Sequence, residues 1–168
     1  MKLLSPAISK FARLRLNTIE QWMEHPLETQ RHVLQHLITE GQNTEFGRKY
    51  KFNQTFRIRD FKDAVPIHTY DDLKPWIDRM LQGEEQVLWN TPVEWFAKSS
   101  GTTSDRSKFI PLSQQSLDEN HYQGSKDLLT LYYHHHPESD LLTGKGLVLG
   151  GSHQVGQLNE DIKFGDLS

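Results

Sequence analysis

Cysteine is absent from this chain of 168 residues. Disulfides, thiolate zinc sites and a cysteine nucleophile are therefore excluded. A chain without cysteine suits a reducing compartment, and we expect a cytoplasmic protein. The length is that of one ordinary domain, which is enough to bury a hydrophobic core.

A basic excess and a long apolar run are also missing. The 19 lysines and arginines are fewer than the 22 aspartates and glutamates, so the formal net charge is −3 and no positive surface indicates a nucleic-acid partner. No apolar stretch is long enough to cross a membrane. The apolar start at residues 1–4 stops at Ser5-Pro6, short of the apolar core that a signal peptide needs. We therefore expect neither nucleic acid nor membrane as a partner.

Helical periodicity dominates residues 1–90, which we assign to a mainly helical N-terminal region. Apolar residues recur at helical spacing in each predicted helix, and Gly41 and Gly83 stand where helix ends belong. Thr69 and Asp72 are spaced as a capping box at the start of one helix. The predicted helices are 7–24, 26–40 and 70–81, with a short helix or turn at 44–50 and a helical turn at 59–64.

The pattern changes in residues 91–168, which we assign to the start of an α/β domain. The predicted elements are strands at 93–97, 108–111 and 146–150, and a long helix from Ser113 to about His135 whose core face includes Leu117, Leu128, Leu131 and Tyr132, with Gly124 allowing close approach. This order predicts the beginning of a mixed sheet with helices. Three short strands are a small sheet, so we expect the rest of it in sequence outside this chain.

A histidine triplet ends the long predicted helix. His134-His135-His136 suggests a metal site, but adjacent helical residues point about 100° apart and do not converge on one ion. Histidines also interact favourably with a helix C-terminus. We interpret the triplet as a helix end and predict no metal ligands in this chain.

A loop rich in hydroxyl side chains joins the first two predicted strands. Glycine allows a tight turn, backbone N–H groups in such turns form anion-binding concavities, and hydroxyls and a lysine add donors and positive charge. Composition alone leaves two interpretations open: a phosphate-binding loop or a flexible turn. The candidate residues for nucleotide binding are Ser99, Ser100, Gly101, Thr102, Thr103 and Lys108.

The loop is not a Walker motif, which needs a glycine, four residues, and then Gly-Lys-Ser or Gly-Lys-Thr. No second glycine precedes Lys108. The three spaced glycines of a dinucleotide-binding loop are missing as well.

The run 99–103, followed by Lys108 and Ile110-Pro111, resembles the phosphate-binding motif of the adenylate-forming superfamily, which includes acyl-CoA synthetases and firefly luciferase. That motif usually has glycine and proline where this chain has Ser104 and Ser107. With these departures the loop is similar to that of one branch, the acyl-acid amido synthetases first known as plant auxin-responsive proteins (the Gretchen Hagen three family), especially its bacterial members. Further stretches are similar to that branch: 44–48, 65–67, 70–72, 83–84, 144–147, 150–152 and 165–168.

The resemblance implies a fold and a reaction. The chain would be the N-terminal portion of the adenylate-forming synthetase fold, with residues 91–168 beginning its ATP-binding domain. ATP and Mg²⁺ would serve to adenylate a carboxylic acid, and an amino acid would accept the acyl group as an amide. The five loop residues 99–103 would hold the ATP phosphates, and Lys108 occupies the lysine position of the motif.

No catalytic residue can be named from the chain itself. The resemblance puts the adenine pocket, the metal-binding acid and a mobile C-terminal domain after Ser168, so the missing C-terminal part of the same enzyme is an expected partner and these 168 residues are expected to be inactive alone. Two alternatives stay open. One is a non-catalytic fragment that keeps a phosphate-binding loop, and the other is an acyl-CoA ligase, which uses coenzyme A as the acceptor.

Overall fold

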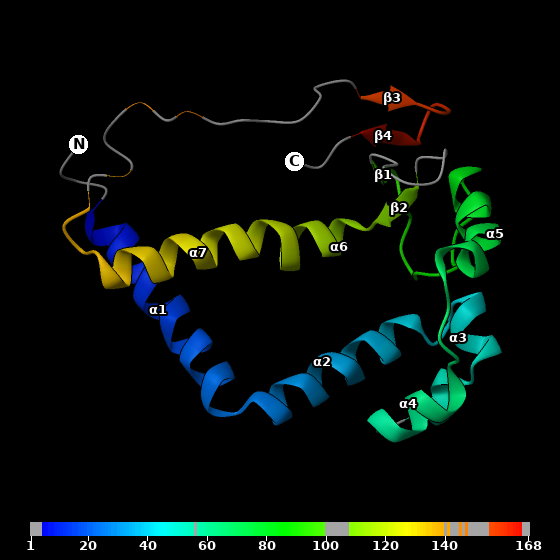
Figure 1. Ribbon diagram of the computed structural model, residues 1–168, viewed down its shortest axis with the longest axis horizontal. Helices are drawn as coiled ribbons and strands as arrows, with labels where there is room; N and C mark the ends of the chain where they lie inside the picture. The colour runs from blue at the N-terminus through cyan, green and yellow to red at the C-terminus, as the bar shows by residue number, and fades with distance from the viewer. Residues whose placement is uncertain are drawn as a thin grey trace. The chain divides into compact units, whose positions relative to one another are not determined.

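The computed structural model describes residues 5–55, 57–99, 108–139, 141, 145, 147 and 155–165 (Figure 1). These residues contain no helix with the length and apolar character needed to span a membrane. The chain divides into two compact units. Unit 1 consists of Met1–Gln30 and Gln115–Leu149, and unit 2 consists of Arg31–Gln114 and Gly150–Ser168.

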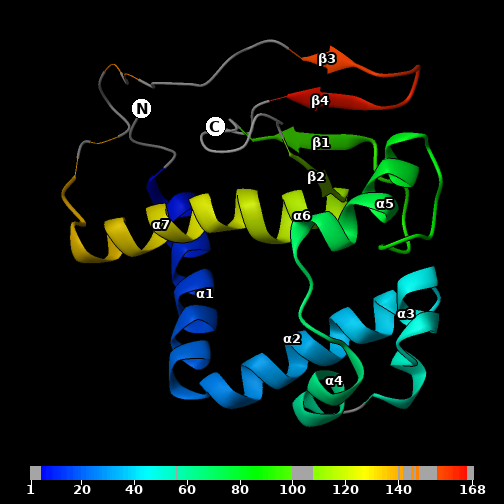
Figure 2. The same ribbon diagram turned by 45° about the vertical axis from the view of Figure 1, so that its right-hand side comes forward.

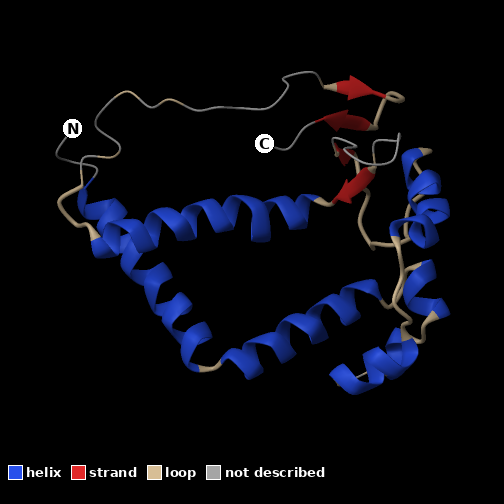
Figure 3. Ribbon diagram, in the orientation of Figure 1, coloured by secondary structure: helices blue, strands red, loops and turns tan. Residues whose placement is uncertain are grey.

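Helices account for most of the described chain (Figure 3). Each helix predicted from the sequence is present, and residues 44–50 contain a short helix rather than only a turn. The helical elements are α1 (Ser5–Glu24), α2 (Pro26–Gly41), α3 (Glu45–Lys49), the 3₁₀ turn η1 (Phe52–Gln54), α4 (Ile58–Ala64), α5 (Tyr70–Leu81), α6 (Gln114–Ser116), the π-helical turn η2 (Leu117–His121) and α7 (Tyr122–His135).

Unit 1 is built on the packing of α1 against α7. Ile19 of α1 and Thr130 of α7 are buried. Arg15 joins the two helices through two hydrogen bonds to Asp127, in which Nε and Nη2 donate to the carboxylate oxygens over 2.6 and 2.7 Å. The guanidinium of Arg15 also lies 4.5 Å from the ring centroid of Trp22.

The predicted core face of the long C-terminal helix is partly wrong. Leu128 is 70% exposed and Tyr132 is 38% exposed, and no described atom lies within 4 Å of a Cβ built on Gly124. The prediction selected the core face by apolar residues alone. The buried side of α7 instead includes Thr130 and Asp127, because α7 packs against α1, where Asp127 pairs with Arg15.

Unit 2 contains a four-stranded mixed sheet in the order β2-β1-β4-β3 (Figure 2). Strand β1 (Trp95–Lys98) is antiparallel to β2 (Phe109–Leu112) and parallel to β4 (Lys163–Gly165), and β3 (Gly156–Gln157) is antiparallel to β4. The mixed sheet and the first two strands confirm the predicted fold class. The predicted strand 146–150 lies mostly outside the described residues.

Strand β2 continues through its proline, which corrects the expectation that Pro111 ends it. Pro111 lies opposite Phe96 in the β1–β2 register. Because β2 is at an edge of the described sheet, a residue without a backbone N–H is tolerated there.

The core of unit 2 lies between α5 and the sheet. Phe96 at the centre of β1 is fully buried, and Ile77 and Met80 of α5 are 4% exposed. Leu73 and Trp76 pack against this cluster, so the apolar residues that recur at helical spacing in α5 form its buried face. The other buried members of the cluster are Val87, Val93 and Ile162.

Candidate nucleotide-phosphate site

Two hydrogen bonds between Ser99 and Lys108 hold the ends of the hydroxyl-rich loop together. The N–H of Ser99 donates to the carbonyl of Lys108 over 3.0 Å, and the N–H of Lys108 donates to Oγ of Ser99 over 3.2 Å. The bonded residues lie one position beyond Lys98 and Phe109, the last pair of the β1–β2 register. Of the six predicted site residues, the structure therefore brings together Ser99 and Lys108, the first and the last. Ser100, Gly101, Thr102 and Thr103 lie outside the described residues.

Lys108 is exposed and lies beside an aromatic ring. Its Nζ is 5.3 Å from the ring centroid of Tyr70, the first residue of α5. No carboxylate of a described residue forms an ion pair with it. An exposed contact between an ammonium and a ring contributes only about 0.5–1 kcal/mol, and it does not use the N–H donors of the ammonium.

Two further lysines of the sheet have the same arrangement. Nζ of Lys98 lies 5.5 Å from the ring centroid of Phe164, and Nζ of Lys163 lies 5.7 Å from that of Trp95. Neither has an ion-pair partner among the described residues. The loop motif does not include Lys98, although this residue directly precedes Ser99 and adds positive charge to the start of the loop.

The first turn of α5 is fixed by the predicted capping box, which the structure confirms. The N–H of Thr69 donates to Asp72 Oδ2 over 2.7 Å, and the N–H of Asp72 donates to Thr69 Oγ1 over 3.3 Å. Oγ1 of Thr69 also donates to the same carboxylate. These bonds stabilise the ionised carboxylate and lower the pKa of Asp72. Tyr70 follows Thr69 directly and is placed by this cap.

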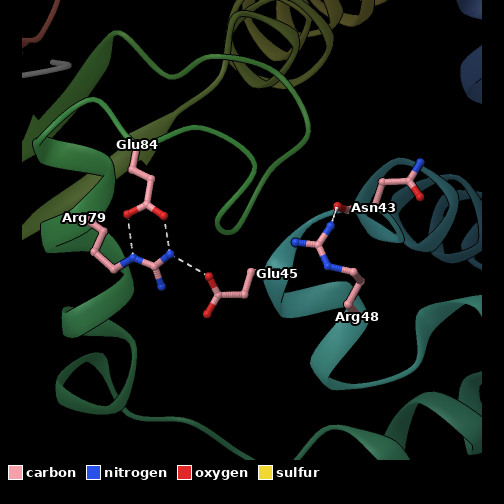
Figure 4. A network of polar contacts seen from close by, with 5 residues as sticks. All are labelled: Asn43, Glu45, Arg48, Arg79 and Glu84. Atoms are coloured by element: carbon pink, nitrogen blue, oxygen red, sulfur yellow. Dashed lines mark hydrogen bonds and ion pairs between the residues drawn. The ribbon is translucent and has the colours of Figure 1, made fainter.

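The last turn of α5 is fixed by the arginine network in Figure 4. Arg79 donates from Nη2 to Glu45 Oε2 over 2.6 Å and from Nε to Glu84 Oε2 over 2.7 Å, and a second bond joins it to Glu84. The guanidinium lowers the pKa of both glutamates, and the two carboxylates raise the pKa of Arg79. The network connects α5 to α3 and to the turn after α5, where Gly83 has a φ of +89°.

Residues 44–48, one of the stretches that carry the family resemblance, form the cap and the first residues of α3. The buried Thr44 caps the helix, because its Oγ1 accepts from the N–H of Gly47 over 2.9 Å and donates to the carbonyl of Gly41 over 2.6 Å. The next two N–H groups, those of Glu45 and Phe46, donate to the carbonyls of Gln86 and Val87 over 2.8 and 3.1 Å. These bonds position α3 against the segment that follows α5.

Other candidate sites are less informative. Among the described residues, no group of three His, Asp or Glu side chains is placed to hold a metal ion. His134 and His135 form the last turn of α7, and His136 caps it, as the helix-end interpretation predicted. An open depression of about 420 Å³ is lined by residues of α3, η1 and α4 and by the neighbouring Tyr50, Lys51 and Thr55. It does not include Ser99 or Lys108.

Comparison with known proteins gives a consistent assignment. The sequence model of the GH3 family N-terminal domain matches residues 15–168. The indole-3-acetic acid-amido synthetase GH3.2 of Arabidopsis thaliana is 34% identical over 104 residues, which are 61% of this chain and 19% of that protein. The jasmonoyl–L-amino acid synthetase JAR4 of Nicotiana attenuata is 31% identical over 90 residues, 53% of this chain and 16% of that protein. The chain therefore spans only a small part of the length of these relatives.

The fold gives the same result. A solved structure of the GH3.15 acyl acid amido synthetase superposes with a TM-score of 0.77 at 26% sequence identity, and the match covers 90% of this chain and 27% of that one. The helical N-terminal region and the small mixed sheet are thus those of an amido synthetase fold. The chain belongs to the GH3 family, and residues 15–168 match its N-terminal domain.

Proposed function

We propose that the protein to which this chain belongs is an acyl-acid amido synthetase, which uses ATP to join a carboxylic acid to the amine of an amino acid. Its relatives are amido synthetases by name, which supports the reaction class. The two residues at the ends of the loop support the use of ATP. Ser99 and Lys108 close the ends of a hydroxyl-rich loop, and the ammonium of Lys108 has no described carboxylate as an ion-pair partner.

The chemistry has two steps. An oxygen of the carboxylate attacks the α-phosphorus of ATP and pyrophosphate leaves, which converts a poor electrophile into an acyl-adenylate. The amine then attacks the acyl carbon, and AMP leaves with that oxygen while the amine loses a proton. Both steps need stabilisation of phosphate charge by positioned donors.

The loop supplies such donors in our assignment. Ser99, Ser100, Gly101, Thr102 and Thr103 would hold the ATP phosphates through hydroxyl and backbone N–H groups, and Lys108 would add positive charge. Mg²⁺ bound with ATP would neutralise further phosphate charge. We assign it no protein ligand, because no cluster of carboxylates or histidines among the described residues is placed for one.

The test is a screen of the product of the complete open reading frame. Carboxylic acids, including indole-3-acetic and jasmonic acid because relatives are named for them, are supplied with Mg²⁺, ATP and labelled pyrophosphate. We expect exchange of pyrophosphate into ATP that depends on an acid, and an amide plus AMP once the matching amino acid is added. The 168-residue chain assayed alone is expected to show no exchange.

Two results would contradict the proposal. If none of the acids in the panel supports exchange of pyrophosphate into ATP, the adenylation step is refuted. Products that form only with coenzyme A, and not with amino acids, would make the protein an acyl-CoA ligase instead.

A further inference from the structure

We propose that Tyr70 is a positioning residue of the phosphate site. Its hydroxyl fixes the first residue of β2, and its ring orients the ammonium of Lys108. The inference rests on the proposed function, because it assumes that Lys108 faces a phosphate group. Tyr70 is 39 positions away from Phe109 along the chain, and the loop motif does not include it.

The hydroxyl of Tyr70 occupies the free edge of β2. Because Ser99 and Lys108 form a hydrogen-bonded pair, the neighbouring pair of Lys98 and Phe109 is of the kind whose N–H and C=O groups point away from the partner strand. The Tyr70 hydroxyl accepts from the N–H of Phe109 over 3.0 Å and donates to its carbonyl over 3.4 Å. One hydroxyl therefore takes both outward polar groups of the residue that follows Lys108.

The ring of Tyr70 acts on Lys108 without using its donors. A ring face attracts the ammonium but accepts no conventional hydrogen bond, whereas a carboxylate in the same place would form an ion pair and compete with a phosphate. The half-buried Tyr70 and the exposed Lys108 thus form a contact that limits where the ammonium lies and leaves its N–H groups for a ligand.

The position of Tyr70 is itself well determined. The capping box of Thr69 and Asp72 fixes the turn that begins with Tyr70, and the bonds of Arg79 to Glu45 and Glu84 fix the other end of α5. The middle of α5 is buried against β1 in the core of unit 2. A helix held at both ends and along its buried face is a rigid support for a side chain that aligns the base of a loop.

The experiment measures binding of Mg²⁺–ATP and of inorganic tripolyphosphate to the product of the complete open reading frame by titration. The variants are Tyr70→Phe, which keeps the ring, and Tyr70→Leu, which removes ring and hydroxyl. Tyr50→Phe is the matched control, since it removes another half-buried hydroxyl of unit 2, the one bonded to His68 over 2.8 Å. Without ligand, NMR records the shift of the Lys108 side-chain methylene protons, assigned with Lys108→Met.

We expect Tyr70→Leu to weaken both ligands by about twofold to fivefold, the effect of losing an exposed contact between an ammonium and a ring. Tyr70→Phe should weaken them less, and Tyr50→Phe should bind as the wild type does. The ring-current shift of Lys108 should vanish in Tyr70→Leu and persist in both phenylalanine variants. In the Lys108→Met background, Tyr70→Leu should have little further effect, which a merely structural role would not produce.

Several results would overturn the inference. Unchanged affinity in both Tyr70 variants would refute it while the proposed function stands, as would a ring-current shift that survives Tyr70→Leu. An equal loss of affinity with and without the Lys108 ammonium would show that Tyr70 acts only on stability. If the wild type binds neither ligand, the phosphate site itself is refuted. Should Tyr70→Leu fail to fold, Tyr70→Phe still tests the hydroxyl, and an affinity equal to that of the wild type would refute its part in the site.

Discussion

At the scale of single residues, the close approach of the end of α2 to the start of α3 requires a glycine, which has no side chain, at position 47. Thr44 caps α3 with its buried hydroxyl, and the backbone of Gly47 passes close to that of Gly41. A Cβ on Gly47 would lie 2.0 Å from the Gly41 carbonyl oxygen and 2.8 Å from its carbon. Both obstacles are backbone atoms, which cannot move aside as the end of a side chain can.

Gly47→Ala is therefore expected to destabilise unit 2 by about 1–3 kcal/mol or more, the range for overpacking a tight site. Gly124→Ala is the matched control, because Gly124 is also helical but has no described atom within 4 Å of its Cβ position. There the gain in helix propensity should stabilise the chain by about 0.5–1 kcal/mol. Urea denaturation followed by circular dichroism measures both, and the same sign for the two changes would contradict the packing argument.

Residue type and the family resemblance select Ser99 and Lys108 as candidates for phosphate binding. The structure joins the two by two hydrogen bonds, and their role in binding stays a prediction. Tyr70 was not selected, because a tyrosine at a helix start has no chemical signature and its partner Phe109 is far along the chain. Only the three-dimensional pairing of β1 with β2 reveals which groups at the edge of β2 need a partner.

At the scale of elements, the packing of α1 on α7 includes a charge pair that lies mostly out of solvent. The side chains of Arg15 and Asp127 are 16% and 20% exposed. The bond from Arg15 lowers the pKa of Asp127 below its ordinary 3.8, and a bond from Gln123 acts in the same direction. A pair in such surroundings is costly to break from one side, since the remaining charge loses its partner.

This pair gives unit 1 a pH dependence. The Asp127 pKa is lower in the folded than in the unfolded chain, so the pair stabilises above the unfolded pKa and loses this effect as pH falls through the folded pKa. Asp127→Asn should lower the unfolding free energy at pH 7 by about 1–3 kcal/mol and flatten its decline below about pH 5. Arg15→Gln should flatten the same region. Urea denaturation at several pH values measures this, and curves parallel to the wild type would contradict it.

Prediction of elements from the sequence worked where period and caps agree. The start of α5 was predicted correctly from Thr69 and Asp72, and its buried stripe from the spacing of Leu73, Ile77 and its neighbours. The core face of α7 was not, because it includes Thr130 and Asp127, whose burial depends on packing against α1 and not on an apolar period. Pro111 was taken as a strand end because the edge position of β2 is a property of the whole sheet.

At the scale of the whole molecule, several stretches that carry the family resemblance lie around α5. Residues 44–48 form the start of α3 and reach Arg79 through Glu45, residues 70–72 are the first turn of α5, and residues 83–84 follow it. These stretches are far from the loop in sequence, but α5 connects them through Tyr70 to Phe109, the residue that follows Lys108. The resemblance therefore includes α5 and the segments that contact it, as well as the loop motif itself.

We propose that the complete protein activates a carboxylic acid as its adenylate, and the transfer of a carboxyl oxygen to the nucleotide distinguishes this from activation as an acyl phosphate. The complete protein is given an acid labelled with ¹⁸O in its carboxyl group, together with Mg²⁺–ATP and the accepting amino acid, and the products are analysed by mass spectrometry. Because the attacking carboxylate oxygen leaves with the nucleotide, our account predicts one ¹⁸O atom in AMP and none in pyrophosphate. Label in inorganic phosphate, with ADP as the nucleotide product, would contradict it.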